Sequence, residues 1–517
     1  MQLSRGRLLL LAGLTLIYVA YLAWYHCPYA GGSDSSGYLN SSRLLLGGKL
    51  STPARVPDGL TAEVLPRSYF TPLGFRLDAT QQNLLPTYPI GLPLHFAAAG
   101  LVFGLEPATM LVGLASALAF VLLLYLTGRE FGVSPGWSLS VALLAAISPL
   151  VLQYALQPMS DLVATVWTLA IILCALRSSR HAGWAAGAGA ALAMAVLVRP
   201  TNLLLVLPAV VALQPRVRTW LAFGLGGLPG ALFLAGYNHA LYGAALTSGY
   251  GDVSSLFALR HVLPSLHNYA TWGLVVATPL VVAAAALPWL RIDRRKKFTL
   301  LAWAGIILLF YAAYEPTQET WWYLRFILPA LPALAIAAAL GLQQINYPAW
   351  FLVSRVLPAD ASPAQVAGGP IVRLPVVVLL FLAAAGWLLA WDRSLRVSQI
   401  ELDDRTYPEV GRWVAGEMPA RAIVAAYQVS GAVLYYSDRP FINPVNLTPE
   451  DHARFSAWLD REHRPFYAVL FPFEEANLLQ RMPGRWEVVT HIRQATVWRR
   501  LGPGEPATTL PTASHRP

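Results

Sequence analysis

Long apolar stretches constrain this chain more than any other feature of its sequence. Segments of close to twenty residues carry no Asp, Glu, Lys or Arg at 108–126, 221–241, 269–290 and 374–391. Each is long enough to cross the hydrocarbon core of a bilayer as an α-helix, in which the backbone satisfies its own hydrogen bonds. Only 12% of the 517 residues are charged, about half the share in a typical soluble protein. We therefore predict an all-α polytopic membrane protein.

Hydropathy predicts eleven membrane spans, and the basic residues between them give the direction of each. The spans are expected at residues 8–25, 108–127, 136–155, 160–177, 182–198, 200–214, 219–241, 269–290, 299–315, 324–345 and 374–391. With the N-terminus in the cytoplasm, the strongly basic loop 291–297 is also cytoplasmic, as the positive-inside rule requires. The short apolar stretch 90–104 is then interfacial or re-entrant, because a full span there would place the basic loop outside.

This topology predicts three regions along the chain. Residues 1–391 form the membrane domain, including an outer loop at 26–107 with interfacial helices. Residues 392–502 have ordinary charge density and alternating strand and helix patterns, which predict a small extracytoplasmic α/β domain. Its strands are expected at 422–427, 466–471, 486–491 and 495–499, and its helices at 408–417, 449–461 and 473–481. Residues 503–517 are rich in Pro and Thr and are expected to be disordered.

The net charge of +10 does not indicate a nucleic-acid partner. Arginine and acidic residues are equal in number from residue 392 to the end, so the whole excess lies in the membrane domain, where basic residues set topology. Cys27 and Cys174 lie in different apolar regions, and the outer histidines lack metal-ligand spacing. No cofactor is predicted on this basis, and a divalent metal stays an open alternative.

The segment GGSDSSGYLN, residues 31–40, places an acid directly after the first expected span. In one interpretation, Ser33 or Asp34 caps an amphipathic helix whose apolar face includes Tyr38. In the other, Asp34 has a chemical role, because the predicted topology puts it at the outer membrane surface, where a lipid head group would lie. The local sequence leaves both open.

Five further segments follow in a fixed order: PTYPIGLPL (86–94), QPMSDLVATVW (157–167), VRPTNLLL (198–205), YNHALYGAALTSGYG (237–251) and WWYLRFILPALPAL (321–334). With the Asp34 segment, they resemble the GT-C fold glycosyltransferases that use polyprenyl-phosphate sugars, in particular the protein O-mannosyltransferase and aminoarabinose-transferase-like group. Ile90 departs from that pattern, since it replaces the second proline of the family's segment. The resemblance ends near residue 345, beyond which only a periplasmic α/β appendage is shared.

The resemblance implies inverting transfer of a glycosyl unit from a polyprenyl-phosphate donor to an acceptor outside the cytoplasm. A sugar joined through C1 to a lipid phosphate already has a good leaving group, so the enzyme needs a carboxylate that takes the proton from the attacking acceptor. Asp34 is the expected base. Asp161 is the expected second acid, which orients the acceptor or a metal, and a helix cap is the alternative for it.

The leaving phosphate requires cationic hydrogen-bond donors. Arg325 and Arg199 are expected to bind it, with lipid anchoring as the alternative for both. Arg43 is a third candidate, although nine residues separate it from Asp34 and turn it to the opposite face of a helix. The expected sugar or acceptor contacts are Tyr38, Tyr88, Trp321, Trp322 and Glu315, for which an interfacial aromatic belt and, for the glutamate, loop solvation are the alternatives.

The expected partners are a polyprenyl-phosphate sugar donor, membrane lipids, and a protein, glycolipid or polysaccharide acceptor. Lysine is scarce beside arginine, and no organelle signal is visible, which together with the resemblance favours a bacterial inner membrane with a periplasmic or extracellular C-terminal domain. A transporter or flippase of lipid-linked sugars, or a scaffold, is the alternative. Transporters show inverted repeats and charges at mid-membrane, and neither is visible here.

Overall fold

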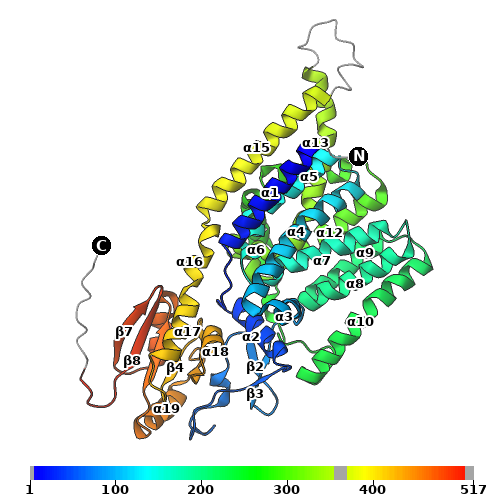
Figure 1. Cartoon of the computed structure of the whole chain (residues 1–517). Helices are drawn as coiled ribbons and strands as arrows, with labels where there is room; N and C mark the ends of the chain where they lie inside the picture. The colour runs from blue at the N-terminus through cyan, green and yellow to red at the C-terminus, as the bar shows by residue number, and fades with distance from the viewer. Residues whose placement is uncertain (1–4, 354–369, 507–517) are drawn as a thin grey trace. The chain divides into compact units, whose positions relative to one another are not determined.

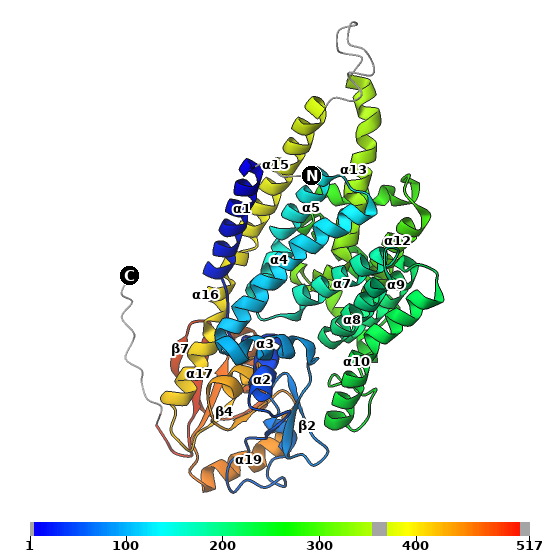
Figure 2. The ribbon, with the colours of Figure 1, turned by 45° about the vertical axis from the view of Figure 1, so that its right-hand side comes forward.

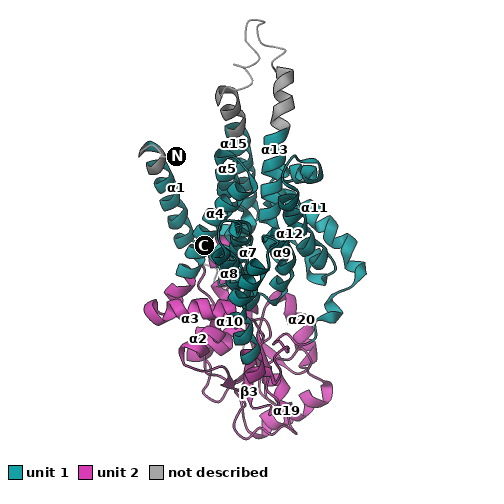
Figure 3. Ribbon diagram, turned by 90° about the vertical axis from the view of Figure 1, so that its right-hand side faces the viewer, with its two compact units in different colours: residues 1–26, 110–236, 252–398 teal, residues 27–109, 237–251, 399–517 magenta. Residues whose placement is uncertain are grey.

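The computed structural model describes residues 5–353 and 370–506, which form two compact units. Unit 1 comprises Met1–His26, Met110–Gly236 and Asp252–Ser398, and unit 2 comprises Cys27–Thr109, Tyr237–Gly251 and Gln399–Pro517 (Figure 3). Most of the tail predicted to be disordered, 503–517, lies outside the described residues. The boundary predicted at residue 391 stays a prediction.

Unit 1 is helical. In chain order it contains α1 (Arg5–Trp24), α4 (Leu105–Phe131), α5 (Pro135–Ala146), α6 (Pro149–Leu156), α7 (Ser160–Arg177), α8 (Ala182–Val198), η2 (Pro200–Leu205), α9 (Val206–Ala212), α10 (Val217–Tyr242), η3 (Ser254–Leu256), η4 (Leu259–His261), α11 (Val262–Val276), η5 (Pro279–Trp289), α12 (Arg294–Ala312), η6 (Glu315–Gln318), η7 (Trp321–Ala330), α13 (Leu331–Val353) and α15 (Pro370–Ser394), where η marks a 3₁₀ helix. Two helices from opposite ends of this unit, α1 and α15, run in similar directions (Figures 1 and 2).

Four helical segments among the described residues are long and apolar enough to cross a membrane: Leu105–Phe131, Ser160–Arg177, Val217–Tyr242 and Trp321–Gln344. The number reaches seven when each of three bent helix pairs counts as one span. Other expected spans are shorter apolar helices, such as Ala182–Val198. The predicted membrane-type helical fold is therefore confirmed, whereas the predicted count of eleven spans is not.

Two expected spans are bent rather than straight. The segment expected at 269–290 divides into α11 and η5, whose axes differ by 115°. Thr278 lies at this break with φ +65°, a left-handed conformation that ends a helix. The segment expected at 136–155 divides into α5 and α6, which differ by 56°, and α6 begins at Pro149. A proline at this position cannot continue the preceding helix because it lacks an amide N–H.

Close contact between α8 and α10 depends on glycine. A Cβ atom built at Gly189 would lie 1.9 Å from the carbonyl oxygen of Phe223, and one built at Gly226 would lie 2.0 Å from that of Ala186. Small residues let helix backbones approach closely, which is how membrane helices gain packing energy without a hydrophobic driving force.

Unit 2 begins with α2 (Asp34–Leu46), a helix that is buried although half of it is polar. Two of its serines can be buried because their hydroxyls form hydrogen bonds within the helix. Ser41 and Ser42 donate to the carbonyls of Gly37 and Tyr38, four residues earlier, at 2.7 Å each. An antiparallel sheet of β1 (Thr52–Pro53), β3 (Asn83–Pro86) and β2 (Phe75–Leu77), with η1 (Arg67–Phe70), follows, and then α3 (Gly91–Phe103).

Residues 399–506, here called the C-terminal α/β region, confirm the predicted α/β character. The elements are α16 (Ile400–Asp404), α17 (Thr406–Gly416), β4 (Ile423–Ala425), α18 (Ser430–Tyr436), β5 (Phe441–Ile442), α19 (Pro449–Arg461), β6 (Phe466–Leu470), α20 (Pro472–Arg481), β7 (Trp486–Ile492) and β8 (Ala495–Arg500), with η8 (Val397–Gln399) at the start. The sheet order is β5-β4-β6-β8-β7, in which β4 is parallel to both β5 and β6.

The strands of this sheet alternate between two cores, as a sheet covered on both faces requires. In β6, Tyr467 and Val469 belong to one buried cluster with residues of α17 and α18, whereas Phe466, Ala468 and Leu470 belong to the other with residues of α19 and α20. The sheet is therefore a three-layer α/β/α arrangement at its parallel end.

Candidate functional site

Asp34 is the first residue of α2, and its half-buried side chain belongs to unit 2. The helix has no side-chain N-cap, because the hydroxyl of Ser33 lies instead 2.7 Å from the hydroxyl of Tyr88. The cap expected from Ser33 is therefore absent. A carboxylate in the first turn still gains from the helix dipole, which stabilises its charged form.

Tyr88 lies beside this carboxylate. Its phenol hydrogen bonds to Asp34, and burial together with the Asp34 charge raises the pKa of Tyr88 well above its usual range. The phenol therefore stays protonated and donates to the carboxylate. The ring packs against two neighbouring glycines: a Cβ at Gly37 would lie 2.3 Å from the ring and one at Gly74 3.2 Å from it. Gly74 also has φ +84°, a conformation that favours glycine.

Two further tyrosines complete this cluster. The ring of Tyr38 lies 5.0 Å from that of Tyr88, and the ring of Tyr250 meets it edge-on at 5.9 Å. The segment 237–251 reaches Tyr88 because Tyr242 donates to the carbonyl of Pro86 at 2.7 Å. The sequence analysis named Tyr38 and Tyr88 as expected contacts of the sugar or acceptor. It did not name Tyr250, although the motif segment 237–251 contains this residue.

Arg43 is not part of this cluster. It lies in the last turn of α2, where its guanidinium stacks over the ring of Tyr435 at 3.6 Å and donates to the carbonyl of the same residue. Nine residues of helix rise separate it from Asp34 by about 13 Å.

A second cluster lies within unit 1, where Asp161 and Arg199 meet. Asp161 is fully buried in the first turn of α7, and Arg199 follows the last residue of α8. The guanidinium of Arg199 forms an ion pair with the Asp161 carboxylate at 2.5 Å and donates to the hydroxyl of Ser160 at 3.3 Å. A buried charge of this kind is stable only when paired, so the two residues fix each other's orientation.

Arg325 lies in the same cluster. Its carbonyl accepts a hydrogen bond from Arg199 at 3.4 Å, and both guanidiniums stack on Phe326, with centres 4.9 Å (Arg325) and 5.5 Å (Arg199) from the ring. Two cations therefore flank one aromatic ring, and Arg199 also pairs with the Asp161 carboxylate.

The other predicted contacts lie nearby in sequence but differ in exposure. The side chain of Trp321 is buried, whereas that of Trp322 is 44% exposed, and their rings are 6.1 Å apart. Tyr154 holds this turn by donating to the carbonyl of Trp322 at 2.6 Å. Glu315 is half-exposed at the start of η6.

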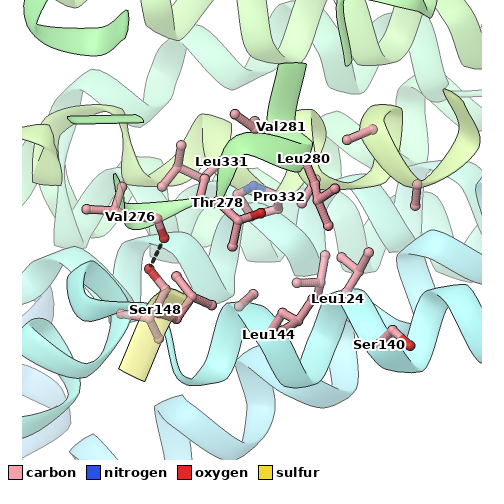
Figure 4. A pocket seen from close by; sticks show the side chains of 18 of the residues that line it. Leu124, Ser140, Leu144, Ser148, Val276, Thr278, Leu280, Val281, Leu331 and Pro332 are labelled. Atoms are coloured by element: carbon pink, nitrogen blue, oxygen red, sulfur yellow. Dashed lines mark hydrogen bonds between the residues drawn. The ribbon is translucent and has the colours of Figure 1, made fainter. Parts of the chain in front are cut away.

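Unit 1 also contains an apolar pocket of about 90 Å³ between helices (Figure 4). Side chains such as Leu144, Leu280 and Leu331 project into it from different helices, and the hydroxyl of Ser148 is turned to the carbonyl of Val276 at 2.6 Å. Its lining is almost entirely hydrocarbon, so it can take only an apolar group.

No three His, Cys, Asp or Glu side chains within residues 5–353 and 370–506 lie close enough together to form a metal-ligand set.

Comparison of the sequence with curated proteins finds no match. A family model, a domain of unknown function (DUF8728), matches residues 394–510. The fold matches the crystal structure of ArnT from Cupriavidus metallidurans bound to undecaprenyl phosphate, with TM-score 0.58, 15% identity, and 96% of this chain and 99% of that chain covered. This chain has the GT-C fold.

Two other GT-C structures agree. AglB of Archaeoglobus fulgidus, an oligosaccharyltransferase solved with an inhibitory peptide and a dolichol-phosphate, matches with TM-score 0.56 and 10% identity over 93% of this chain and 71% of its own. The mycobacterial arabinofuranosyltransferase AftD matches with TM-score 0.53 and 13% identity over 98% of this chain and 42% of its own. The GT-C fold predicted by the resemblance is thus confirmed over nearly the whole chain.

Proposed function

We propose that this protein transfers a glycosyl unit, with inversion at C1, from a polyprenyl-phosphate donor to an acceptor on the extracytoplasmic side of a bacterial inner membrane. The observation that carries this proposal is a half-buried carboxylate at the start of α2, Asp34, in a chain of GT-C fold. ArnT and AglB were solved with polyprenyl phosphates, which supports a donor of this class.

Asp34 is the proposed general base. The acceptor oxygen or nitrogen attacks C1, the bond between C1 and the phosphate oxygen breaks, polyprenyl phosphate leaves, and the acceptor proton passes to Asp34. Tyr88 donates to this carboxylate and so orients it toward the acceptor. Because the attack is in line, the configuration at C1 inverts.

Arg199 and Arg325 are the proposed ligands of the leaving phosphate, since guanidinium groups form strong charge-assisted hydrogen bonds to phosphate and these two lie against one ring, that of Phe326. We assign Asp161 the role of orienting Arg199 rather than that of a base, because its carboxylate is fully buried and already ion-paired. Arg43 is left out of the proposal, since its guanidinium is engaged with Tyr435.

The sugar or acceptor is proposed to contact Tyr38, Tyr88 and the exposed face of Trp322, with Trp321 and Glu315 as further contacts of the same loop. The apolar pocket of unit 1 suits a segment of the isoprenoid chain. The eleven-span topology, the outer position of the C-terminal region, and the acceptor classes given above belong to the same proposal. The flippase alternative has no feature of the described residues in its favour.

Turnover of donor in proteoliposomes tests the proposal. Wild type and Asp34→Asn are each offered a panel of polyprenyl-phosphate sugars with crude envelope acceptors, and release of polyprenyl phosphate is followed. We expect Asp34→Asn to lower kcat by about 10²- to 10⁴-fold with donor binding kept, as for loss of a general base. Asp58→Asn, which changes an exposed carboxylate of the same outer loop, serves as the matched control. Equal kcat in wild type and Asp34→Asn would refute the assignment of the base, and no turnover by wild type would refute the function.

A further inference from the structure

The parallel strands of the C-terminal α/β region end at a switch in strand order. The chain passes from β4 to β5 on one side and then to β6 on the other side of β4. The loops that follow β4 and β6 therefore diverge between these two strands. In open α/β sheets, ligands bind outside the carboxyl ends of the strands at such a point. The groups that contact the loop after β4 therefore show what occupies the position where a ligand would bind in such a sheet.

The chain's own Asp34 segment lies there. Ser430, at the end of the loop after β4, accepts a hydrogen bond from the backbone N–H of Leu73 at 3.1 Å. The next residue, Gly431, accepts one from the side-chain amide of Asn40 at 3.0 Å. A Cβ atom at Gly431 would lie 2.1 Å from the hydroxyl oxygen of Ser36, so no larger residue fits without a shift.

The same region also contacts the residues that lead into α2. The backbone N–H of Ala30 donates to the hydroxyl of Tyr436 at 3.1 Å, and the hydroxyl of Tyr29 donates to Glu401 at 2.6 Å. These bonds and the one from Asn40 bracket Asp34 in sequence, before and after it. The backbone that carries the proposed base is therefore fixed on both sides by residues about 370 to 410 positions further along the chain.

Ser430 is linked to Tyr88 as well, through two intervening residues. Leu73, which it binds, precedes Gly74, and Gly74 is one of the two glycines that pack against the Tyr88 ring. The Ser430 hydroxyl of the C-terminal region thus fixes the backbone next to Gly74, which packs against the tyrosine that orients Asp34.

We propose that the C-terminal α/β region positions the catalytic segment of the enzyme, and that Ser430 and Asn40 are positioning residues for the transfer reaction. This inference rests on the proposed function for its consequence in catalysis. General-base transfer depends steeply on geometry, and a displacement of about 1 Å can cost on the order of 10²-fold in rate. It follows that the region matched by the family model at residues 394–510 is needed for turnover, although the proposed mechanism assigns no step to its residues.

The test compares two serines at the two ends of α18. Ser430→Ala removes the hydroxyl that binds Leu73, whereas Ser437→Ala, at the residue that follows α18, removes a buried hydroxyl that donates to the carbonyl of Val433 in that helix. Asn40→Ala removes the bond to Gly431 from the other side. Amide hydrogen exchange of residues 34–42 is measured in the full-length protein in proteoliposomes, together with kcat and the donor KM for a polyprenyl-phosphate sugar that wild type turns over.

We expect Ser430→Ala and Asn40→Ala to speed exchange in residues 34–42 by at least about 10-fold and to lower kcat by about 10- to 100-fold, with the donor KM within about 3-fold of wild type. Ser437→Ala is expected to change neither by more than about 3-fold. Exchange and kcat that are the same in Ser430→Ala and Ser437→Ala would overturn the inference. A wild type without turnover would overturn the proposed function and with it the catalytic role, whereas the exchange data alone decide whether the region holds α2.

Discussion

Glu474→Gln is predicted to stabilise the C-terminal α/β region at neutral and alkaline pH. Glu474 lies in the first turn of α20, and only 6% of it is exposed. Burial raises the pKa of its carboxyl from 4.5 to about 7, partly offset by a hydrogen bond from the backbone of Gln428. The ionised form is therefore disfavoured in the folded region.

The size and sign of the effect follow from this shift. Between pH 4.5 and 7 the folded chain keeps a proton on Glu474 that the unfolded chain has released, so the free energy of unfolding falls as the pH rises through this window and is constant above it. A shift of this size corresponds to about 3 kcal/mol, and partial solvent access lowers the expected value to about 2 to 3 kcal/mol. Glutamine mimics the protonated acid and removes this loss.

The assay is amide hydrogen exchange of strand β6 in the full-length protein, with wild type and Glu474→Gln compared at pH 5 and pH 8. We expect opening free energies that differ by less than about 1 kcal/mol near pH 5 and a variant more stable by about 2 to 3 kcal/mol at pH 8. Glu475→Gln, at the half-exposed neighbouring position, is the control for removing one charge from this helix. A difference between wild type and Glu474→Gln that does not change with pH would refute the reasoning.

Three further predictions concern the two clusters. Tyr88→Phe should lower kcat by about 10-fold or more, because Asp34 loses a donor, and should shift the acid limb of the pH–rate profile upward; a profile identical to that of wild type would contradict this. Gly37→Ala should displace the Tyr88 ring and lower kcat and stability together, whereas Gly224→Ala, where a Cβ meets open space, should leave both unchanged in the same assays. Arg199→Ala should destabilise the protein by about 3 to 5 kcal/mol in denaturant titrations, and adding Asp161→Leu should recover part of this loss; strictly additive losses would show that the pair is not coupled.

Local periodicity predicted the C-terminal α/β region well. The alternating apolar residues of β6, β7 and β8 and the amphipathic pattern of α19 gave boundaries within one or two residues of those observed. The strand β5 has two residues and α18 has seven, too few for either period to show. Hydropathy located the apolar segments of unit 1 but not their bends. It measures how apolar a segment is and carries no information on backbone angles such as the positive φ of Thr278.

The sequence proposes individual residues for the candidate site but not the contacts among them. Asp34, Tyr88, Asp161, Arg199 and Arg325 were selected as functional residues from their chemistry and order. Their contacts could not be derived, because partners such as Asp161 and Arg199 come from different helices whose packing no local pattern encodes. The contacts of Ser430 with Leu73 and of Tyr250 with Tyr88 could not be predicted from the sequence for the same reason.

Unit 2 is built from segments that lie far apart in the sequence, which affects when it can form during synthesis. Asn40 and Gly431 are 391 positions apart, and the chain between them must be synthesised before they can meet. At about 5 to 20 residues per second, this takes roughly 20 to 80 s, during which the buried polar face of α2 lacks its final partners. The surroundings of Asp34 are thus completed only after Gly431 has been synthesised, so a nascent chain or one terminated before that residue would carry the proposed base without the geometry that makes it effective.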